Sequence, residues 1–269
     1  MPCVTPILGA GVTPMTTDAS TSTSTQERRA VLGIGRELTV PQQLACALRI
    51  LAAEGWQEWL SGHITWAQEG TENLWCNPWG IWWEETKASD IVLVGMDGEI
   101  VEGKWPVSSA VFIHTELHRQ RPDARVVVHG HPYYTTLLAG MGETPEIIHQ
   151  NTAIFDGDIA YVDEYDGFVL DAMSGAQLAQ QIGSATGIVL ANHGAIVTGE
   201  TVAQACYQSV LFERMCRFHY DTMVAGRKPK AIPAETRAVM KAGLKVGAAP
   251  IYWDGAVRQL LRREPEVLG

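Results

Sequence analysis

Apolar residues at helical spacing alternate with short aliphatic runs along the chain from about residue 40 onward. Leu44, Leu48 and Leu51 recur every three or four positions and end at Gly55. The Thr-Val-Pro-Gln sequence at 39–42 supplies an N-cap, an early proline and a glutamine at the capping-box position. This pattern predicts a helix from residue 40 to Gly55.

Short runs of β-branched and aliphatic residues predict strands. The run at 126–128 consists of three valines, and a similar run occupies 188–191. Such runs are typical of buried strands. An Asp-Gly turn at 97–98 joins the strand predicted at 91–94 to residues 99–101 as a hairpin. The segment 59–66 predicts a turn followed by a strand.

Further helices are expected between these strands. Their predicted ranges are 106–120, 133–139, 174–182 and 201–225, and residues 226–269 are expected to form a partly helical tail packed on the body or on a neighbouring chain. Alternating strands and helices favour an α/β layered domain with a central sheet. Residues 1–36 are rich in serine and threonine and predict a flexible tail, so we expect a single domain over 37–269.

Composition excludes several classes of partner. The net charge is −10 and no basic stripe is present, which argues against nucleic acid. No apolar run reaches the ~18 residues of a membrane span. The five cysteines form no C-x-x-C pair and no secretory signal is evident, so we expect a cytoplasmic protein.

Three histidines follow the apolar runs and form the candidate chemical site. His129 and His131 are two residues apart at the end of a predicted strand, so their side chains point to the same face. His193 follows the run at 188–191, and it can join them if the two strands are neighbours. Three imidazoles with an open position form the ligand set of a catalytic divalent metal. The alternative is that each is a structural histidine with a satisfied hydrogen bond.

Five segments in this order resemble the class II aldolase/adducin family. They are Gly-His-Ile-Thr at 62–65, Asp-Gly-Glu-Ile-Val-Glu-Gly at 97–103, Pro-Val-Ser-Ser-Ala-Val-Phe-Ile-His at 106–114, Arg-Pro-Asp-Ala-Arg-Val-Val-Val-His-Gly-His-Pro at 121–132 and Asn-His-Gly at 192–194. The resemblance implies a three-layer α/β/α sandwich around a mostly antiparallel sheet. It also implies a homotetramer with sites between subunits, and a Zn, Mn or Fe(II) ion on His129, His131 and His193.

The chain departs from the sugar-phosphate aldolases of that family at the acid/base position. Ala110 stands where those enzymes carry a glutamate, and alanine cannot transfer a proton. Glu116 lies six residues further on and off the same helix face. His114, one turn from Ala110, is the candidate acid/base. The alternative is that His114 only forms hydrogen bonds to the metal ligands.

The phosphate pocket of the family also looks altered. Gly62-His63 and the turn at 77–80 replace the family's small amide and hydroxyl donors. Trp79, with Trp82 and Trp83, adds bulky aromatic surface there. An aromatic-lined pocket favours an unphosphorylated, aromatic carboxylate, although these tryptophans can equally be core or interface residues.

The candidate substrate-binding residues follow from the same comparison. His63 and either Ser108 or Ser109 are expected to hold a carboxylate, with Trp79 beside them. The tyrosine that the family places at its subunit interface has no obvious counterpart, and His149 falls near its position.

Three functions remain open at this point. The first is a metal-dependent lyase that cleaves a C–C bond, by retro-aldol reaction or decarboxylation, in an aromatic hydroxy- or oxo-acid. The second is a non-haem Fe(II) oxygenase like the family members of aminocoumarin biosynthesis, because a three-histidine site with no nearby carboxylate base can bind iron, O₂ and substrate. The third is a non-catalytic, adducin-like interaction module.

Overall fold

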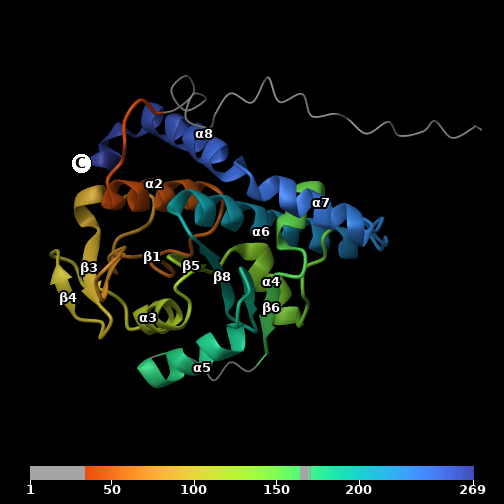
Figure 1. Ribbon diagram of the computed structural model, residues 1–269, viewed down its shortest axis with the longest axis horizontal. Coiled ribbons are helices and arrows are strands. Elements are labelled where there is room, and N and C mark those ends of the chain that lie inside the picture. The colour runs from red at the N-terminus through yellow and green to blue at the C-terminus, as the bar shows by residue number, and fades with distance from the viewer. Residues whose placement is uncertain (1–33, 164–168, 170) are drawn as a thin grey trace, which may run out of the picture.

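A computed structural model describes residues 34–163, 169 and 171–269, and most of the predicted N-terminal tail lies outside these ranges. An eight-stranded sheet runs through the molecule (Figure 1). Its strands are β1 (His63–Ala67), β2 (Asn73–Cys76), β3 (Val92–Gly95), β4 (Ile100–Glu102), β5 (Val126–Gly130), β6 (Ile159–Val162), β7 (Gly187–Leu190) and β8 (Gly194–Gly199). The strand order is β4-β3-β2-β1-β5-β8-β7-β6, and every pair is antiparallel except β6 with β7.

Helices cover both faces of this sheet, as Figure 1 shows. One face carries α2 (Val40–Ala53), α4 (Tyr133–Met141), α6 (Val202–Val224) and α8 (Ala248–Arg263), with α7 (Ala234–Lys245) at the end of this layer. The other face carries α3 (Val111–Gln120) and α5 (Ala172–Ile182). The predicted three-layer α/β/α sandwich with a mostly antiparallel sheet is therefore confirmed.

Strand β5 lies near the middle of the sheet and is buried on both sides. Val126 and Val128 belong to the core beneath α2 and α6, whereas Val127 packs with Ile113 of α3. Successive strand side chains point to opposite faces, so His129 lies on the same face as Val127. The strand therefore directs His129 toward the α3 layer.

Helix α3 begins five residues later than the pattern predicts. The prediction of a helix from residue 106 is wrong, because the helix starts at Val111. The backbone N–H of Ala110 donates to the Ser108 hydroxyl at 3.2 Å, so this segment forms a turn ahead of the helix. Serine side chains compete with helical hydrogen bonds in this way and favour helix ends over interiors. His114 keeps its place within the helix.

The C-terminal residues pack on the body of the same chain. Helix α8 buries Trp253 and Val257 in the core shared with α2 and α6. The buried guanidinium of Arg49 in α2 contacts Glu264 at 2.8 Å and Glu266 at 2.9 Å. Of the two arrangements predicted for the tail, the structure shows packing on the body.

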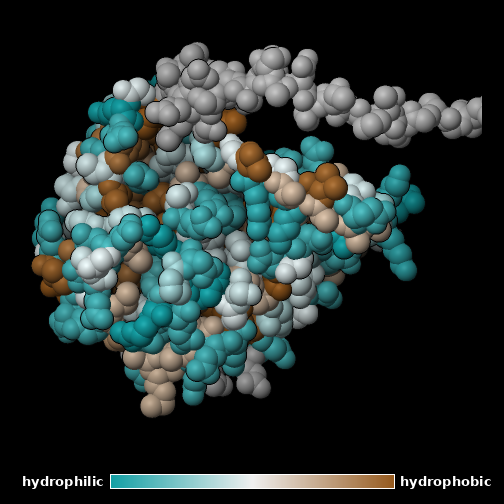
Figure 2. Space-filling view, in the orientation of Figure 1, coloured by the Kyte–Doolittle hydropathy of each residue, from teal (hydrophilic) through white to brown (hydrophobic). Residues whose placement is uncertain are grey.

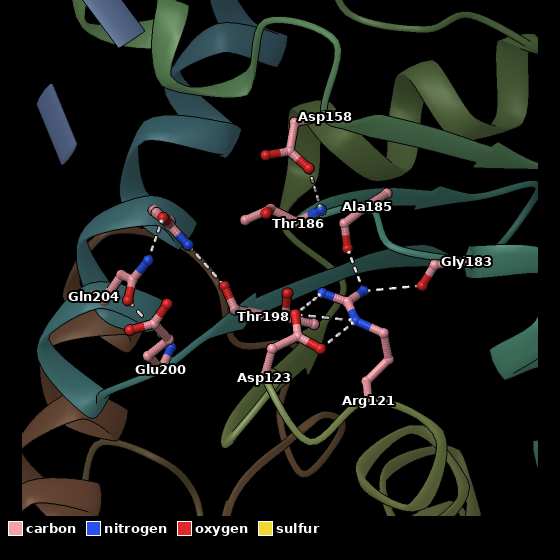
Figure 3. A network of polar contacts seen from close by, with 10 residues as sticks. Arg121, Asp123, Asp158, Gly183, Ala185, Thr186, Thr198, Glu200 and Gln204 are labelled. Carbon is pink, nitrogen blue, oxygen red and sulfur yellow. Dashed lines mark hydrogen bonds and ion pairs between the residues drawn. The ribbon is translucent and has the colours of Figure 1, made fainter. Parts of the chain in front are cut away.

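A polar network fixes the ends of β7 and β8 that lie away from His193 (Figure 3). The guanidinium of Arg121 donates to the carbonyl oxygens of Gly183 at 3.0 Å and Ala185 at 2.9 Å. The amide of Gln208 in α6 donates to the Thr198 carbonyl at 2.7 Å. These bonds anchor the two strands to both helical layers, so the turn at their other end is held in place.

Some apolar side chains remain on the surface, notably at the β4 edge of the sheet (Figure 2). Ile100 is 43% exposed and Val101 is 57% exposed. Exposed apolar edge strands are suited to pairing with another chain. The predicted homotetramer is not tested by a single chain and stays a prediction. Among the described helices, none has the combined length and apolar character that a bilayer span requires.

Candidate metal centre

Three imidazoles converge at one end of the central strands. Candidate ligand nitrogens of His129, His131 and His193 all lie within 4.8 Å of one another. The ring centroids are 4.8 Å apart for His129 and His193, and 4.9 Å for His131 and His193. The structure thus brings together the three residues that the sequence proposes as metal ligands.

The route by which His193 reaches this point differs from the expectation. The run at 188–191 forms β7, which does not adjoin β5, because β8 lies between them. His193 lies in the turn that joins β7 to β8, and Ala195 of β8 is opposite Gly130 of β5. The start of β8 therefore lies beside the end of β5, and the turn carries His193 to the other two rings.

Two glycines permit this close approach. A Cβ atom on Gly194 would lie 2.5 Å from the Gly130 carbonyl oxygen and 2.8 Å from Cδ2 of His131. A Cβ atom on Gly130 would lie 2.9 Å from the Trp56 carbonyl oxygen. Real Cβ atoms do not make such short contacts, so each histidine-bearing strand end needs the glycine beside it.

Hydrogen bonds orient two of the rings for metal binding. Nδ1 of His129 lies 2.9 Å from the Ala195 carbonyl oxygen, and Nδ1 of His131 lies 2.6 Å from a carboxylate oxygen of Glu58. These oxygens accept, so each Nδ1 carries a proton, and the neutral form of each ring presents the Nε2 lone pair. Nε2 of His131 is buried and makes no hydrogen bond. This donor set fits a divalent metal ion.

Burial keeps His129 and His193 in the form that binds metals. Desolvation, followed by the charges of the neighbouring histidines, holds the pKa of His129 well below its usual value. Desolvation and then His131 lower the pKa of His193 to about 4. Both rings are therefore neutral at pH 7, and neutral imidazole is the metal-binding form.

Further buried histidines adjoin this cluster on the α3 side. His63 of β1 is opposite His129 of β5, and their rings stack with centroids 6.4 Å apart. The centroid of His114 lies 5.6 Å from that of His63 and 6.3 Å from that of His129. Neither ring nitrogen of His63 has a hydrogen-bond partner. The candidate acid/base and one candidate substrate-binding residue thus lie beside the candidate metal ligands.

Thr65 of β1 connects this group to His118, the second histidine of α3. Its hydroxyl lies 2.8 Å from Nδ1 of His114 and 2.8 Å from Nε2 of His118. Desolvation is the main cause that lowers the pKa of both His114 and His118, the latter to about 4. The sequence placed His114 and His118 on one helix face but gave no signal that Thr65 bridges them, since that contact depends on β1 packing against α3.

The other candidate substrate-binding residues occupy adjoining segments. The N–H of Trp79 donates to the Pro106 carbonyl at 2.8 Å, which joins the 77–80 turn to the segment that carries Ser108 and Ser109. Asn77 connects the same turn to β1, because its side chain accepts from the N–H of Ile64 at 2.7 Å. Trp79 is 50% exposed, and the Ser108 hydroxyl already accepts from the backbone ahead of α3.

The structure does not bring His149 to the cluster within this chain. Its ring packs against Phe218 of α6, with centroids 5.4 Å apart, and its Nδ1 accepts from the N–H of Asn151. It caps a short 3-10 helix over Gln150–Phe155. A contact of His149 with the site of a neighbouring subunit stays a prediction.

A cavity of about 560 Å³ adjoins the cluster. Among the described residues its lining comprises Gln57, Glu58, His131, Tyr133, Thr136, Leu137, Gly140 and Met141. The aromatic side chain here is Tyr133, whereas Trp79 and Trp82 do not belong to the lining. Trp83 is fully buried in the core, so the alternative interpretation of core packing is confirmed for it.

The structure also corrects the expectation that no carboxylate lies near the site. Glu58 contacts His131 and lines the cavity. It was missed because it lies in a loop, where carboxylates are mostly solvated, and no local pattern indicates which loop carboxylate will face a histidine.

Comparisons with known proteins agree with this geometry. The family model described as "Class II Aldolase and Adducin N-terminal domain" matches residues 42–220. Decarboxylase NovR of Streptomyces niveus is 33% identical over 214 residues, which cover 78% of this chain and 78% of that protein. The 4-hydroxy-3-prenylphenylpyruvate oxygenase/4-hydroxy-3-prenylbenzoate synthase of Streptomyces roseochromogenus subsp. oscitans is 32% identical, over 78% of this chain and 76% of that protein. The crystal structure of an aldolase II superfamily protein from Pseudomonas syringae superposes with a TM-score of 0.77 at 26% identity, over 85% of this chain and 94% of that one.

Proposed function

The chain belongs to the class II aldolase and adducin family, and from this premise we propose that it is a metal-dependent lyase. Its reaction is the cleavage of a C–C bond, by decarboxylation or retro-aldol reaction, in an unphosphorylated aromatic hydroxy- or oxo-acid. One observation carries the proposal: ring nitrogens of His129, His131 and His193 lie within 4.8 Å of one another beside a cavity of about 560 Å³.

The three histidines would hold the ion, two of them through Nε2. Their rings are presented by strand ends and a turn that glycines allow to meet closely. When bound, a divalent ion supplies a Lewis acid that withdraws electrons from substrate oxygens as negative charge develops. The surrounding rings are buried, so water is largely excluded from their side of the site, and electrostatic stabilisation is stronger in such surroundings.

His114 is the proposed proton-transfer residue. Its Nδ1 is engaged by Thr65, and its Nε2 is buried without a hydrogen-bond partner next to His63 and His129. A neutral imidazole with a free nitrogen can accept or hold a proton at that atom. Ala110 has no group that can transfer a proton. His114, which follows one helix turn later, would supply this group instead.

The substrate class follows from what lines the site. Asn77 is engaged with the backbone of β1, and the Ser108 hydroxyl caps the turn ahead of α3. The side-chain amide of Asn77 also donates to the carbonyl oxygens of Gly62 and Pro78, each at 3.4 Å, so it is less available as a phosphate donor. The cavity instead offers Tyr133, Leu137 and Met141, which suit an apolar or aromatic group. The name of one relative, a prenylphenylpyruvate oxygenase, supports an aromatic acid, and the name of another, a decarboxylase, supports decarboxylation.

A non-haem Fe(II) oxygenase is the second candidate. It is favoured by the name of the oxygenase from Streptomyces roseochromogenus subsp. oscitans, which is 32% identical to this chain. A three-histidine site with open positions is compatible with iron chemistry. In this case O₂ would be a co-substrate and the same cavity would hold the aromatic acid.

Elemental analysis of the purified protein, paired with turnover assays, tests both candidates. Aromatic hydroxy- and oxo-acids are screened with Zn²⁺, Mn²⁺ or Fe²⁺, each with and without O₂. Turnover without O₂ supports the lyase and excludes the oxygenase. Turnover that requires both Fe²⁺ and O₂ supports the oxygenase. A protein that binds none of these ions and folds equally well after chelation supports an adducin-like module, and it overturns the proposal.

A further inference from the structure

We propose that Glu58 is a positioning residue that holds His131 in its metal-binding tautomer. This inference rests on the proposed function, because it assigns a supporting group to the same metal centre. Its basis is the 2.6 Å contact between a Glu58 carboxylate oxygen and Nδ1 of His131. The second nitrogen of that ring, Nε2, is buried and makes no hydrogen bond.

The chemistry of the contact assigns the proton. A carboxylate accepts hydrogen bonds, so Nδ1 of His131 carries the hydrogen and Nε2 presents its lone pair to the cluster. A carboxylate behind a metal-ligating histidine fixes the ring orientation and makes the ring a better donor. For His129 the corresponding acceptor is the Ala195 carbonyl, which is backbone and neutral. Glu58 therefore places a negative charge behind His131, whereas the Ala195 carbonyl behind His129 carries none.

The loop that carries Glu58 is anchored at both ends. At one end Trp56 is fully buried, and its indole N–H donates to the Ser209 carbonyl at 3.0 Å. At the other end a Cβ atom on Gly62 would lie 2.7 Å from the His129 carbonyl oxygen and 2.8 Å from Trp83. The loop is thus packed directly against the backbone that carries His129.

Between these anchors the loop adopts a strained turn around Glu58. The N–H of Ser61 donates to the Glu58 carbonyl at 2.9 Å. Trp59 has a φ of 51°, in the left-handed region that bulky residues rarely adopt. Such strain persists only when the surroundings impose it, and it concentrates at functional sites. The turn holds the Glu58 side chain beside His131 at the rim of the cavity.

A simple surface ion pair is the competing interpretation. The Glu58 side chain is 46% exposed, and pairs this exposed contribute little to stability. That interpretation predicts that removal of Glu58 changes neither metal affinity nor the tautomer of His131. The positioning role predicts a change in both, and the second can be measured without any metal.

The test compares E58A with E54A in the full chain. Glu54 ends helix α2 with an exposed side chain, four residues before Glu58, and is the matched control. Zn²⁺ affinity is measured by competition with a chromophoric chelator. We expect E58A to bind Zn²⁺ about 10–100-fold more weakly than wild type, and E54A to bind as wild type does. In the metal-free protein, ¹⁵N NMR should show His131 with a protonated Nδ1 in wild type and a mixture of tautomers in E58A.

Each result has a defined meaning. Equal Zn²⁺ affinity in E58A and wild type, or an unchanged His131 tautomer, overturns the role of Glu58 while the metal centre stands. A wild-type protein that binds no divalent ion instead overturns the proposed function, and the NMR comparison still tests the contact. If E58A folds poorly, E58M, which keeps the side-chain length but has no oxygen acceptor, takes its place in the affinity measurement.

Discussion

The hydroxyl of Thr65 lies 2.8 Å from Nδ1 of His114 and at the same distance from Nε2 of His118. A hydroxyl carries one proton, so it donates to one ring and accepts from the other. Burial lowers the pKa of His118 to about 4, and its Nδ1 is buried without a hydrogen-bond partner. The tautomers of His114 and His118 are therefore coupled to each other through Thr65.

T65V should destabilise the fold, because it leaves two buried imidazole nitrogens without partners. Each unsatisfied buried group costs about 1–3 kcal/mol. Urea unfolding of the metal-free protein measures the change, and T65S, which keeps the hydroxyl, is the control. An unfolding midpoint for T65V equal to that of wild type would contradict the bridging role.

H131A should abolish metal binding and turnover together. The substitution removes one of three candidate ligands, so the loss of affinity should exceed the ~10–100-fold typical of losing a supporting group. Elemental analysis and turnover are measured on the same preparation, with H149A as a control for metal content only, at a histidine that lies away from the cluster in this chain. Turnover that survives without bound metal would contradict the mechanism.

H114Q should reduce turnover far more than metal content. Glutamine keeps a polar side chain but cannot transfer a proton as imidazole does, and such groups contribute about 10²–10⁴-fold to rate. The rate is compared with metal content measured in parallel. If instead His114 only supports the ligands, metal content and turnover should fall in proportion.

G194A should disturb the metal centre through sterics alone. The added Cβ would lie 2.5 Å from the Gly130 carbonyl oxygen, so the β5 and β8 ends must separate. Overpacking of this kind costs about 1–3 kcal/mol. G243A, at an open and exposed helix position in α7, is the matched control and should not be destabilised. Thermal unfolding and Zn²⁺ affinity provide the two readouts, and normal values of both for G194A would refute the close-approach argument.

Stability of the metal-free protein should fall as the pH drops from about 6.5 to 4. Burial lowers the pKa of His63 and His118 to about 4, whereas in the unfolded chain these groups titrate near 6.5. In that window the unfolded chain binds protons that the folded chain does not, so the free energy of unfolding rises with pH. Urea unfolding at several pH values should show a shallower slope for H118N. An identical slope would mean that His118 is not buried in its neutral form.

Local patterns in the chain were sufficient for much of the fold. The capping box at 39–42 is formed as expected, with Thr39 and Gln42 exchanging hydrogen bonds. The valine run at 126–128 forms the buried strand β5, and the turn at 97–98 joins β3 to β4. These features depend on neighbours in sequence: the 3.6- and 2-residue periods, cap chemistry and turn residues.

The sequence by itself determined that His129 and His131 share a face, because alternation along a strand is a local property. Only the tertiary structure decided that the β7–β8 turn carries His193 to them, that Thr65 bridges two histidines of α3, and that Glu58 faces His131. These contacts join residues that are 49 to 73 positions apart. Strand order and loop packing set such distances, and both arise from burial of the whole core, which no single segment encodes.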